Sequence, residues 1–279
     1  MGSNLWIGAP GSLYEIDQAT TSFDRSADLG VSEFKSLGGL VTVTRTASTT
    51  RRTKLSWDRL PPADARALDR LARRIDGPGP LVLIDPVAGN VLGAAQAAGR
   101  GVAGAGDVSG LDQWFKVSAT GAVVEVAGAP GTFAFTAADA TSKLGWRCVP
   151  WQGNFPVAAG TRISFRAPSA IAALGTVGVN IDFKKADGSY LSGPSATGPY
   201  VAATVPAGAV FATPCATPGT AGTYSLAGAC LSYDDGAAHT IPGDGLPQLA
   251  VTTYTDTPGL PLPYRSINLE LVEVSRATS

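Results

Sequence analysis

The chain has 279 residues and a formal net charge of -1 at pH 7, and 15% of its residues are charged. A near-neutral chain lacks the basic field that gathers DNA or RNA, and its composition differs from that of disordered proteins, so both classes are excluded. The 34 glycines and 20 prolines favour many short strands joined by turns, and the length suffices for one large or two ordinary domains.

The N-terminal sequence MGSNLWIGAPGS has neither a positively charged segment nor an apolar stretch, so we expect no secretory signal. No apolar run reaches the length of a membrane span, and we expect no membrane insertion. The cysteines Cys148, Cys215 and Cys230 lack CxxC spacing. They are either reduced thiols, or Cys215 and Cys230 pair across a hairpin-like stretch.

Charge density falls after a Gly/Ala-rich stretch at residues 94–110. This shift predicts a first domain at residues 1–100, a linker at residues 101–107 and a second domain at residues 108–279. Both domains are predicted to be mainly β.

In the first domain, alternating apolar and polar residues predict strands near Leu5–Gly8, Gly38–Arg45, Arg52–Trp57 and Leu81–Asp85. One helical segment lies between the last two of these strands. We therefore predict a small β-barrel or sheet with one α-helix.

That helix lies within PPADARALDRLARRIDGPGP, residues 61–80. Its apolar stripe has helical spacing and consists of Leu68, Leu71, Ala72 and Ile75. Prolines are tolerated at the helix start, and the glycines and prolines that follow Asp76 end the helix.

The arginines of this helix lie off the apolar stripe and alternate with aspartates. This balance of signs favours a solvated or subunit-facing surface over a nucleic-acid site. The candidate subunit-interface residues are Arg66, Arg70 and Arg73.

The second domain has short alternating segments separated by turns, and no helical stripe. The segment TVGVNIDFKKADGSY places Val179, Ile181 and Phe183 on one face before a turn at Asp187–Gly188. The segment RSINLELVEV closes the domain. About eight such strands predict an antiparallel β-sandwich of jelly-roll type.

Aromatic residues of the second domain suggest a platform for sugar rings, since apolar ring faces stack on indole. The candidate glycan-binding residues are Trp146, Trp151 and Tyr190. The alternative is that Trp146 and Trp151 fill the sandwich core.

No catalytic motif stands out. The only histidine, His239, lies in a turn-rich stretch, and no serine lies in a GxSxG motif. A glycosidase would need two carboxylates across a cleft, and the spacing of Asp182 and Glu125 selects neither. We expect that the chain is not an enzyme and that it uses no cofactor.

Metal binding by Cys and His is excluded by number and spacing. The loop YDDGAAHTIPGDG offers Asp234, Asp235 and Asp244 near backbone carbonyls. The loop is suited either to calcium or to ordinary turn chemistry, and the spacing matches no EF-hand. We predict no metal site.

Residues 38–92 resemble the N-terminal domain of minor tail proteins of long-tailed (siphovirus-type) actinobacterial phages, with distal tail protein character. The resemblance rests on the Arg-rich hairpin ending in Trp57, the single helix and the sequence GPGPLVLIDPVAGNVL. It implies a barrel-plus-helix domain that forms a ring, usually hexameric, continuing the tail tube. The second domain resembles the jelly-roll, carbohydrate-binding-module-like extensions of such rings.

The resemblance implies a structural virion protein of the tail tip, assembled in the host cytoplasm. Its partners would be further copies of itself, neighbouring tail-tube and tail-tip proteins and a host cell-wall glycan. The alternative is a monomeric carbohydrate-binding protein without catalytic activity.

Overall fold

The computed structural model describes residues 4–45, 49–77, 79–85, 89–102, 113–239, 241–259 and 262–274. The chain divides into two compact units, each made of two segments. The sandwich unit contains Met1–Leu13 and Val82–Leu246, and the hairpin unit contains Tyr14–Leu81 and Pro247–Ser279.

This division differs from the predicted domains at residues 1–100 and 108–279. The predicted sandwich includes the C-terminal segment, but in the structure this segment completes a sheet with strands from the first part of the chain. The predicted linker at residues 101–107 lies outside the described residues from residue 103 onward.

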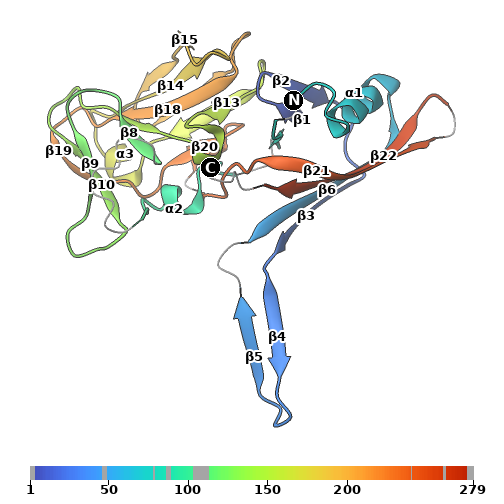
Figure 1. Ribbon diagram of the computed structural model, residues 1–279. Coiled ribbons are helices and arrows are strands. Elements are labelled where there is room, and N and C mark those ends of the chain that lie inside the picture. The colour runs from blue at the N-terminus through green and yellow to red at the C-terminus, as the bar shows by residue number, and fades with distance from the viewer. Residues whose placement is uncertain are drawn as a thin grey trace. The chain divides into compact units, whose positions relative to one another are not determined.

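The hairpin unit has a four-stranded antiparallel sheet in the order β21-β22-β6-β3 (Figure 1). The strands are β3 (Ser22–Asp28), β6 (Thr50–Leu60), β21 (Leu249–Pro258) and β22 (Arg265–Glu273). Leu269 lies opposite Leu55, and Ile267 lies opposite Trp57. These four side chains are buried, so alternation along the two central strands gives the sheet one apolar face.

Helix α1 (Pro62–Ala72) contacts β21 and β22 and buries Ala65 and Leu68. The predicted apolar stripe is therefore correct at Leu68. It is wrong at Ile75, which is exposed because the helix ends at Ala72 and Arg74 adopts a left-handed conformation with φ 54.

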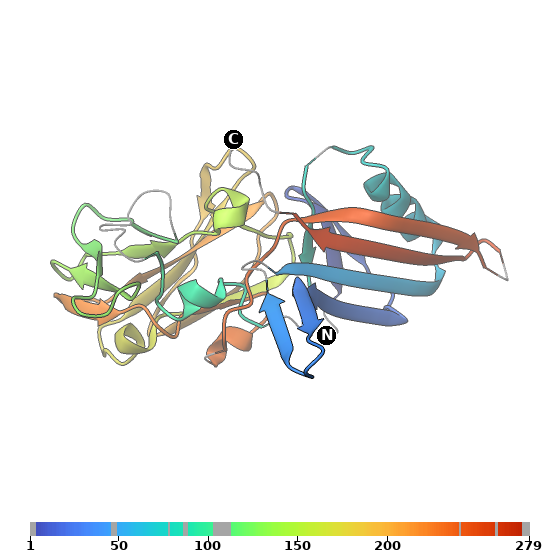
Figure 2. The ribbon, with the colours of Figure 1, turned by 60° about the horizontal axis from the view of Figure 1, so that its bottom comes forward.

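Between β3 and β6 the chain forms a hairpin, the arm, from β4 (Val31–Lys35) and β5 (Val41–Arg45). Figures 1 and 2 show the arm extending beyond the ends of β3 and β6. Every side chain of both strands is exposed.

The largest sheet of the sandwich unit has seven strands in the order β15-β14-β18-β11-β8, with β12 paired to β18 and β16 paired to β14. Its strands are β8 (Trp114–Lys116), β11 (Leu144–Trp146), β12 (Phe155–Pro156), β14 (Gly178–Lys184), β15 (Tyr190–Ser192), β16 (Ser195–Thr197) and β18 (Phe211–Thr217).

The described residues of the unit also form three smaller sheets, in the orders β17-β13-β20, β19-β10-β9 and β2-β1-β7, and strand β2 continues into the hairpin unit. Their strands are β1 (Leu5–Ala9), β2 (Ser12–Ile16), β7 (Val82–Ile84), β9 (Ala122–Glu125), β10 (Phe133–Ala137), β13 (Arg162–Arg166), β17 (Tyr200–Thr204), β19 (Gly222–Ser225) and β20 (Cys230–Ser232). The short helices are α2 (Ala94–Ala97), η1 (Val149–Trp151), α3 (Ser169–Ala172) and η2 (Gly236–Ala238).

The sheets of the sandwich unit face a common apolar core. Trp146 of the seven-stranded sheet contacts Phe165 of β13 with ring centroids 5.0 Å apart, and Trp114 contacts Phe133 of β10 at 5.8 Å. The predicted fold class, mainly β with an antiparallel β-sandwich and a sheet carrying one α-helix, is confirmed.

Candidate functional site

The outer face of the seven-stranded sheet carries an open groove of about 490 Å³. Alternation along β14 places Val179, Ile181 and Phe183 in the core, and therefore turns Asn180 and Asp182 outward into the groove. The groove is lined by Lys143, Gly178, Val179, Asn180, Asp182, Tyr190, Gly193, Ser195, Ala196, Thr197 and Thr217.

The Asp182 carboxylate is the polar centre of the groove. The Asn180 side-chain amide donates a hydrogen bond to Asp182 Oδ1 at 2.6 Å, and the Lys143 ammonium lies 3.9 Å from Oδ2. These contacts fix the orientation of the carboxylate, while its two oxygens retain further acceptor capacity.

Tyr190 and Asp182 meet above Gly193. A Cβ atom at residue 193 would lie 2.7 Å from the Tyr190 hydroxyl and 2.8 Å from Asp182 Oδ1. A larger residue at this point would require both groups to move. Tyr190 is 63% exposed, so its ring is available to a ligand.

The groove combines an exposed aromatic ring with hydroxyl, amide, ammonium and carboxylate groups. Sugars present apolar ring faces that stack on aromatic side chains and hydroxyls that pair with such polar groups. Because Lys143 and Asp182 balance each other in charge, the groove suits an uncharged polyhydroxylated ligand.

A second cluster lies further along the same face. The Lys184 ammonium donates to Asn154 Oδ1 at 2.8 Å, and burial lowers its pKa. Burial also raises the pKa of the Cys215 thiol to about 12, so it stays protonated at neutral pH. These groups are engaged within the protein and support the sheet surface beside the groove.

Phe115 does not provide a second stacking ring. Its ring crosses Gly145 so closely that a Cβ there would lie 2.4 Å from it, and the Arg147 guanidinium lies 4.7 Å from the ring centroid. The strand backbone and Arg147 therefore both crowd this ring.

The predicted tryptophan platform is corrected by the structure. Trp146 is 0% exposed and Trp151 is 6% exposed, so neither presents a ring face to a sugar. Trp151 instead donates its indole N–H to the Leu246 carbonyl at 3.1 Å. Of the three predicted glycan-binding residues, only Tyr190 lies at the groove.

The predicted interface arginines lie on α1 or at its C-terminal end. Arg66 and Arg70 are exposed, as is Arg73, the residue that caps the helix. Arg73 pairs with Asp69, and Arg70 pairs with Asp76. These charges lie on an exposed polar surface, and their place in a subunit contact stays a prediction.

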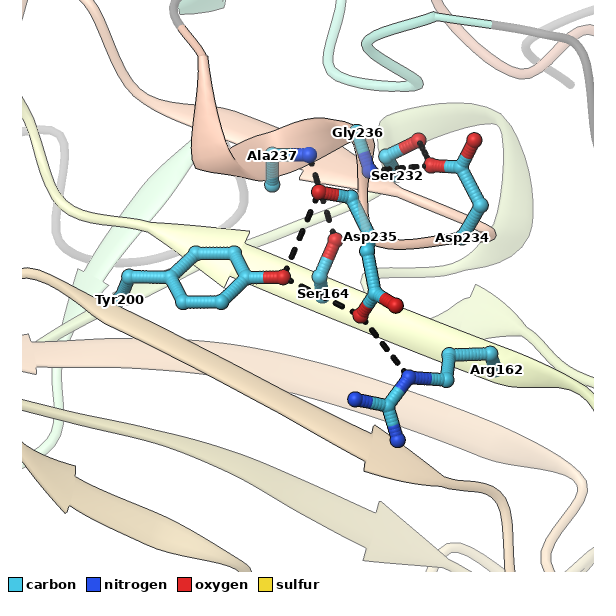
Figure 3. A network of polar contacts seen from close by, with 8 residues as sticks. All are labelled: Arg162, Ser164, Tyr200, Ser232, Asp234, Asp235, Gly236 and Ala237. Carbon is cyan, nitrogen blue, oxygen red and sulfur yellow. Dashed lines mark hydrogen bonds and ion pairs between the residues drawn. The ribbon is translucent and has the colours of Figure 1, made fainter.

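The acidic loop after β20 is held by protein contacts (Figure 3). Asp235 accepts hydrogen bonds from Arg162 at 2.8 Å and from Tyr200 at 3.2 Å. Asp234 accepts from the Ser232 hydroxyl at 2.6 Å and from the Gly236 N–H. The two carboxylates therefore organise the turn and fasten it to the sheet β17-β13-β20.

Within the described ranges, no three His, Cys, Asp or Glu side chains come together in a way that could hold a metal ion. Cys148, Cys215 and Cys230 are buried free thiols, so Cys215 and Cys230 form no disulfide. His239 is exposed at the end of η2. Among the described residues, no helix has the length and apolar character needed to span a bilayer.

No protein-family model matches the chain, and no curated protein matches it. Among solved structures, it is similar to the enzymatically active domain of tailspike protein 4 of bacteriophage CBA120, with 13% identity and a TM-score of 0.32 over 51% of this chain and 21% of that chain. It is similar to an arabinose-bound α-L-arabinofuranosidase, with 13% identity and a TM-score of 0.30 over 52% of this chain and 26% of that chain.

It is also similar to a carbohydrate-binding module of the β-sandwich superfamily, with 15% identity and a TM-score of 0.25 over 80% of this chain and 86% of that chain. The matched region spans only 21% of the tailspike chain and 26% of the arabinofuranosidase chain. Its structural neighbours include a phage tailspike domain and a carbohydrate-binding β-sandwich.

The prediction that the chain is not an enzyme has no support and is corrected here: the solved structures to which the chain is similar include two that are enzymes by their descriptions. The prediction rested on the isolated His239 and on the lack of a serine motif. The absence of these two features does not bear on catalysis by carboxylates.

Most of the groove residues are not among those predicted from the sequence. The alternation along VNIDF already places Asn180 and Asp182 opposite the core face, and this signal could have found them. Lys143, Gly193 and Ser195 join the site only through strand pairing, which the sequence does not reveal.

Proposed function

We propose that the chain is a structural protein of a phage tail tip that assembles into a ring, a hexamer by the resemblance, and joins the tail tube to the tip. The observation that carries this proposal is the open sheet of the hairpin unit. Its outer strands, β21 and β3, each have one edge without a neighbouring strand among the described residues, although Leu249 at the start of the β21 edge pairs with the backbone of Leu81.

Free edges of long strands favour pairing with another chain. If β21 of one copy meets β3 of the next, the contact is head-to-tail, and a head-to-tail contact gives a closed ring when its rotation closes. The resemblance of residues 38–92 to phage tail proteins supports this form of assembly. The charged surface with Arg66, Arg70 and Arg73 is then placed at or beside subunit contacts.

Hydrogen–deuterium exchange tests the role of the edges. Assembly should slow exchange in the peptides that cover Ser22–Asp28 and Leu249–Pro258, compared with dilute, dissociated protein. Peptides from the central strand Thr50–Leu60 serve as the control, because its backbone is already paired on both sides. Equal exchange of the edge peptides in assembled and dissociated protein would count against the proposal.

The groove favours a second role, contact of the sandwich unit with a host-surface glycan. The same role would serve a monomeric carbohydrate-binding protein. Titration calorimetry with neutral cell-wall oligosaccharides should detect binding by the wild-type chain. Tyr190→Ala should weaken it about tenfold through loss of ring stacking, whereas Tyr264→Ala, which removes another exposed aromatic ring, should not. Lack of binding to every neutral oligosaccharide would remove this role.

A further inference from the structure

The arm of the hairpin unit is a two-stranded sheet with apolar side chains on both faces. Val31, Val41 and Val43 are exposed, and Phe34 is 68% exposed. An isolated two-stranded hairpin is marginally stable in water, and a third strand or a packed face is needed for an ordered sheet. We therefore expect a partner to add a strand to the arm or to pack against one of its faces.

The outer edge of β4 offers a defined set of backbone groups. The Ser36 N–H donates to the Leu40 carbonyl at 2.8 Å, so the backbone groups of Ser36 point toward β5. Because these groups alternate along a strand, Phe34 also points inward, while Glu33 and Lys35 point to the free edge. Among the described residues, β4 pairs with β5 alone.

The sequence of β4, VSEFK, is complementary to itself when two copies run antiparallel. With Phe34 on the two-fold axis, Glu33 of each copy lies opposite Lys35 of the other. The backbone groups of Glu33 and Lys35 point to the shared edge, so each Glu33–Lys35 pair between the copies is a hydrogen-bonded pair. The two Phe34 residues then face each other as a non-hydrogen-bonded pair.

The neighbouring registers lack this match. A shift that centres the axis on Glu33 places two carboxylates opposite each other, and one centred on Lys35 places two ammonium groups opposite each other. Opposite charges that face each other across strands stabilise a sheet and like charges destabilise it, so charge selects the register centred on Phe34.

We propose that the arms of two copies of this chain pair through β4, antiparallel about a two-fold axis at Phe34. The product is a continuous four-stranded sheet in the order β5-β4-β4-β5. On one face the two Phe34 rings are neighbours, with Thr42 beside each ring. This contact uses only the arm and is independent of the proposed ring, whose contacts lie on β21 and β3.

Charge exchange tests the register. Glu33→Lys alone, or Lys35→Glu alone, opposes like charges at both ends of the pairing and should weaken two-fold association about tenfold or more, measured by sedimentation. The double variant Glu33→Lys/Lys35→Glu restores both pairs and should restore association. Arg45→Glu is the matched control, because it reverses a charge on β5 and should leave association unchanged. Failure of the double variant to restore association would overturn the proposal.

A cysteine at the axis gives a second test that does not depend on affinity. The native cysteines are buried, so an introduced surface thiol reacts alone. Cα atoms in a non-hydrogen-bonded pair lie about 4.5 Å apart, within disulfide range. Under mild oxidation, Phe34→Cys should form a covalent dimer and Val41→Cys, on β5, should not. Equal crosslinking of the two variants, or none for Phe34→Cys, would refute the pairing.

Discussion

The rings of Trp146 and Phe165 pack against each other between two facing sheets of the sandwich unit. Their centroids are 5.0 Å apart, and the angle between the ring planes is 58°. Trp146→Ala should therefore lower the free energy of unfolding by about 3–5 kcal/mol, the usual cost of emptying a large buried aromatic site. Denaturant unfolding measures this loss. Tyr190→Ala, at an exposed ring, should leave stability nearly unchanged, and an equal loss in both variants would contradict the core assignment.

Gly193→Ala should weaken ligand binding with little loss of stability. The added methyl group requires the Tyr190 hydroxyl and Asp182 Oδ1 to move, because both lie within 2.8 Å of its position. Gly175→Ala is the matched control, since nothing lies within 4 Å of a Cβ at that residue. Calorimetric titration with the oligosaccharide bound by the wild type should separate the two variants, and equal affinities would remove Gly193 from the site.

The loop at Asp139 should make stability depend on pH. Hydrogen bonds from the side chain and backbone of Thr141, with smaller contributions from Ser142 and Thr120, lower the pKa of the Asp139 carboxyl. A lowered folded-state pKa gives stabilisation that is present above the usual Asp pKa of about 3.9 and lost as the pH falls through the folded value.

Asp139→Asn should accordingly lower Tm at pH 7, and the difference from the wild type should narrow below about pH 4. Thermal unfolding followed by circular dichroism between neutral and acidic pH measures this convergence. A difference that stays constant across the range would show that the carboxylate charge is not involved.

Charge reversal at the end of α1 tests the proposed interface. The pairs Arg70–Asp76 and Arg73–Asp69 are exposed, so Arg70→Glu/Arg73→Glu should have only a small effect on folding stability. The same double variant should reduce ring assembly measured by light scattering. Lys185→Glu, a charge reversal on the exposed turn after β14, is the control, and full assembly of the α1 variant would exclude this surface from the interface.

Local sequence patterns predict the elements whose signals are local. The helix that contains Leu68 and the alternating strand that contains Ile181 both follow from residue spacing alone. The strands β3 and β4 were missed because their exposed, mostly polar side chains leave no apolar alternation.

The division into units was missed for a different reason. Leu269 and Leu55 are far apart in the chain, and their pairing depends on strand order and not on any neighbouring residue. The tryptophans were ambiguous because indole serves both cores and sugar platforms. Burial decides between these roles, and a single sequence does not reveal burial.

The native mass of the purified full chain, combined with negative-stain imaging, tests the proposed ring most directly. We predict closed particles of about six copies with a central hole. These particles should persist in Glu33→Lys, because the ring does not use the arm. A wild-type chain that remains monomeric over a wide concentration range, or that forms only arm-linked pairs lost in Glu33→Lys, would contradict the ring.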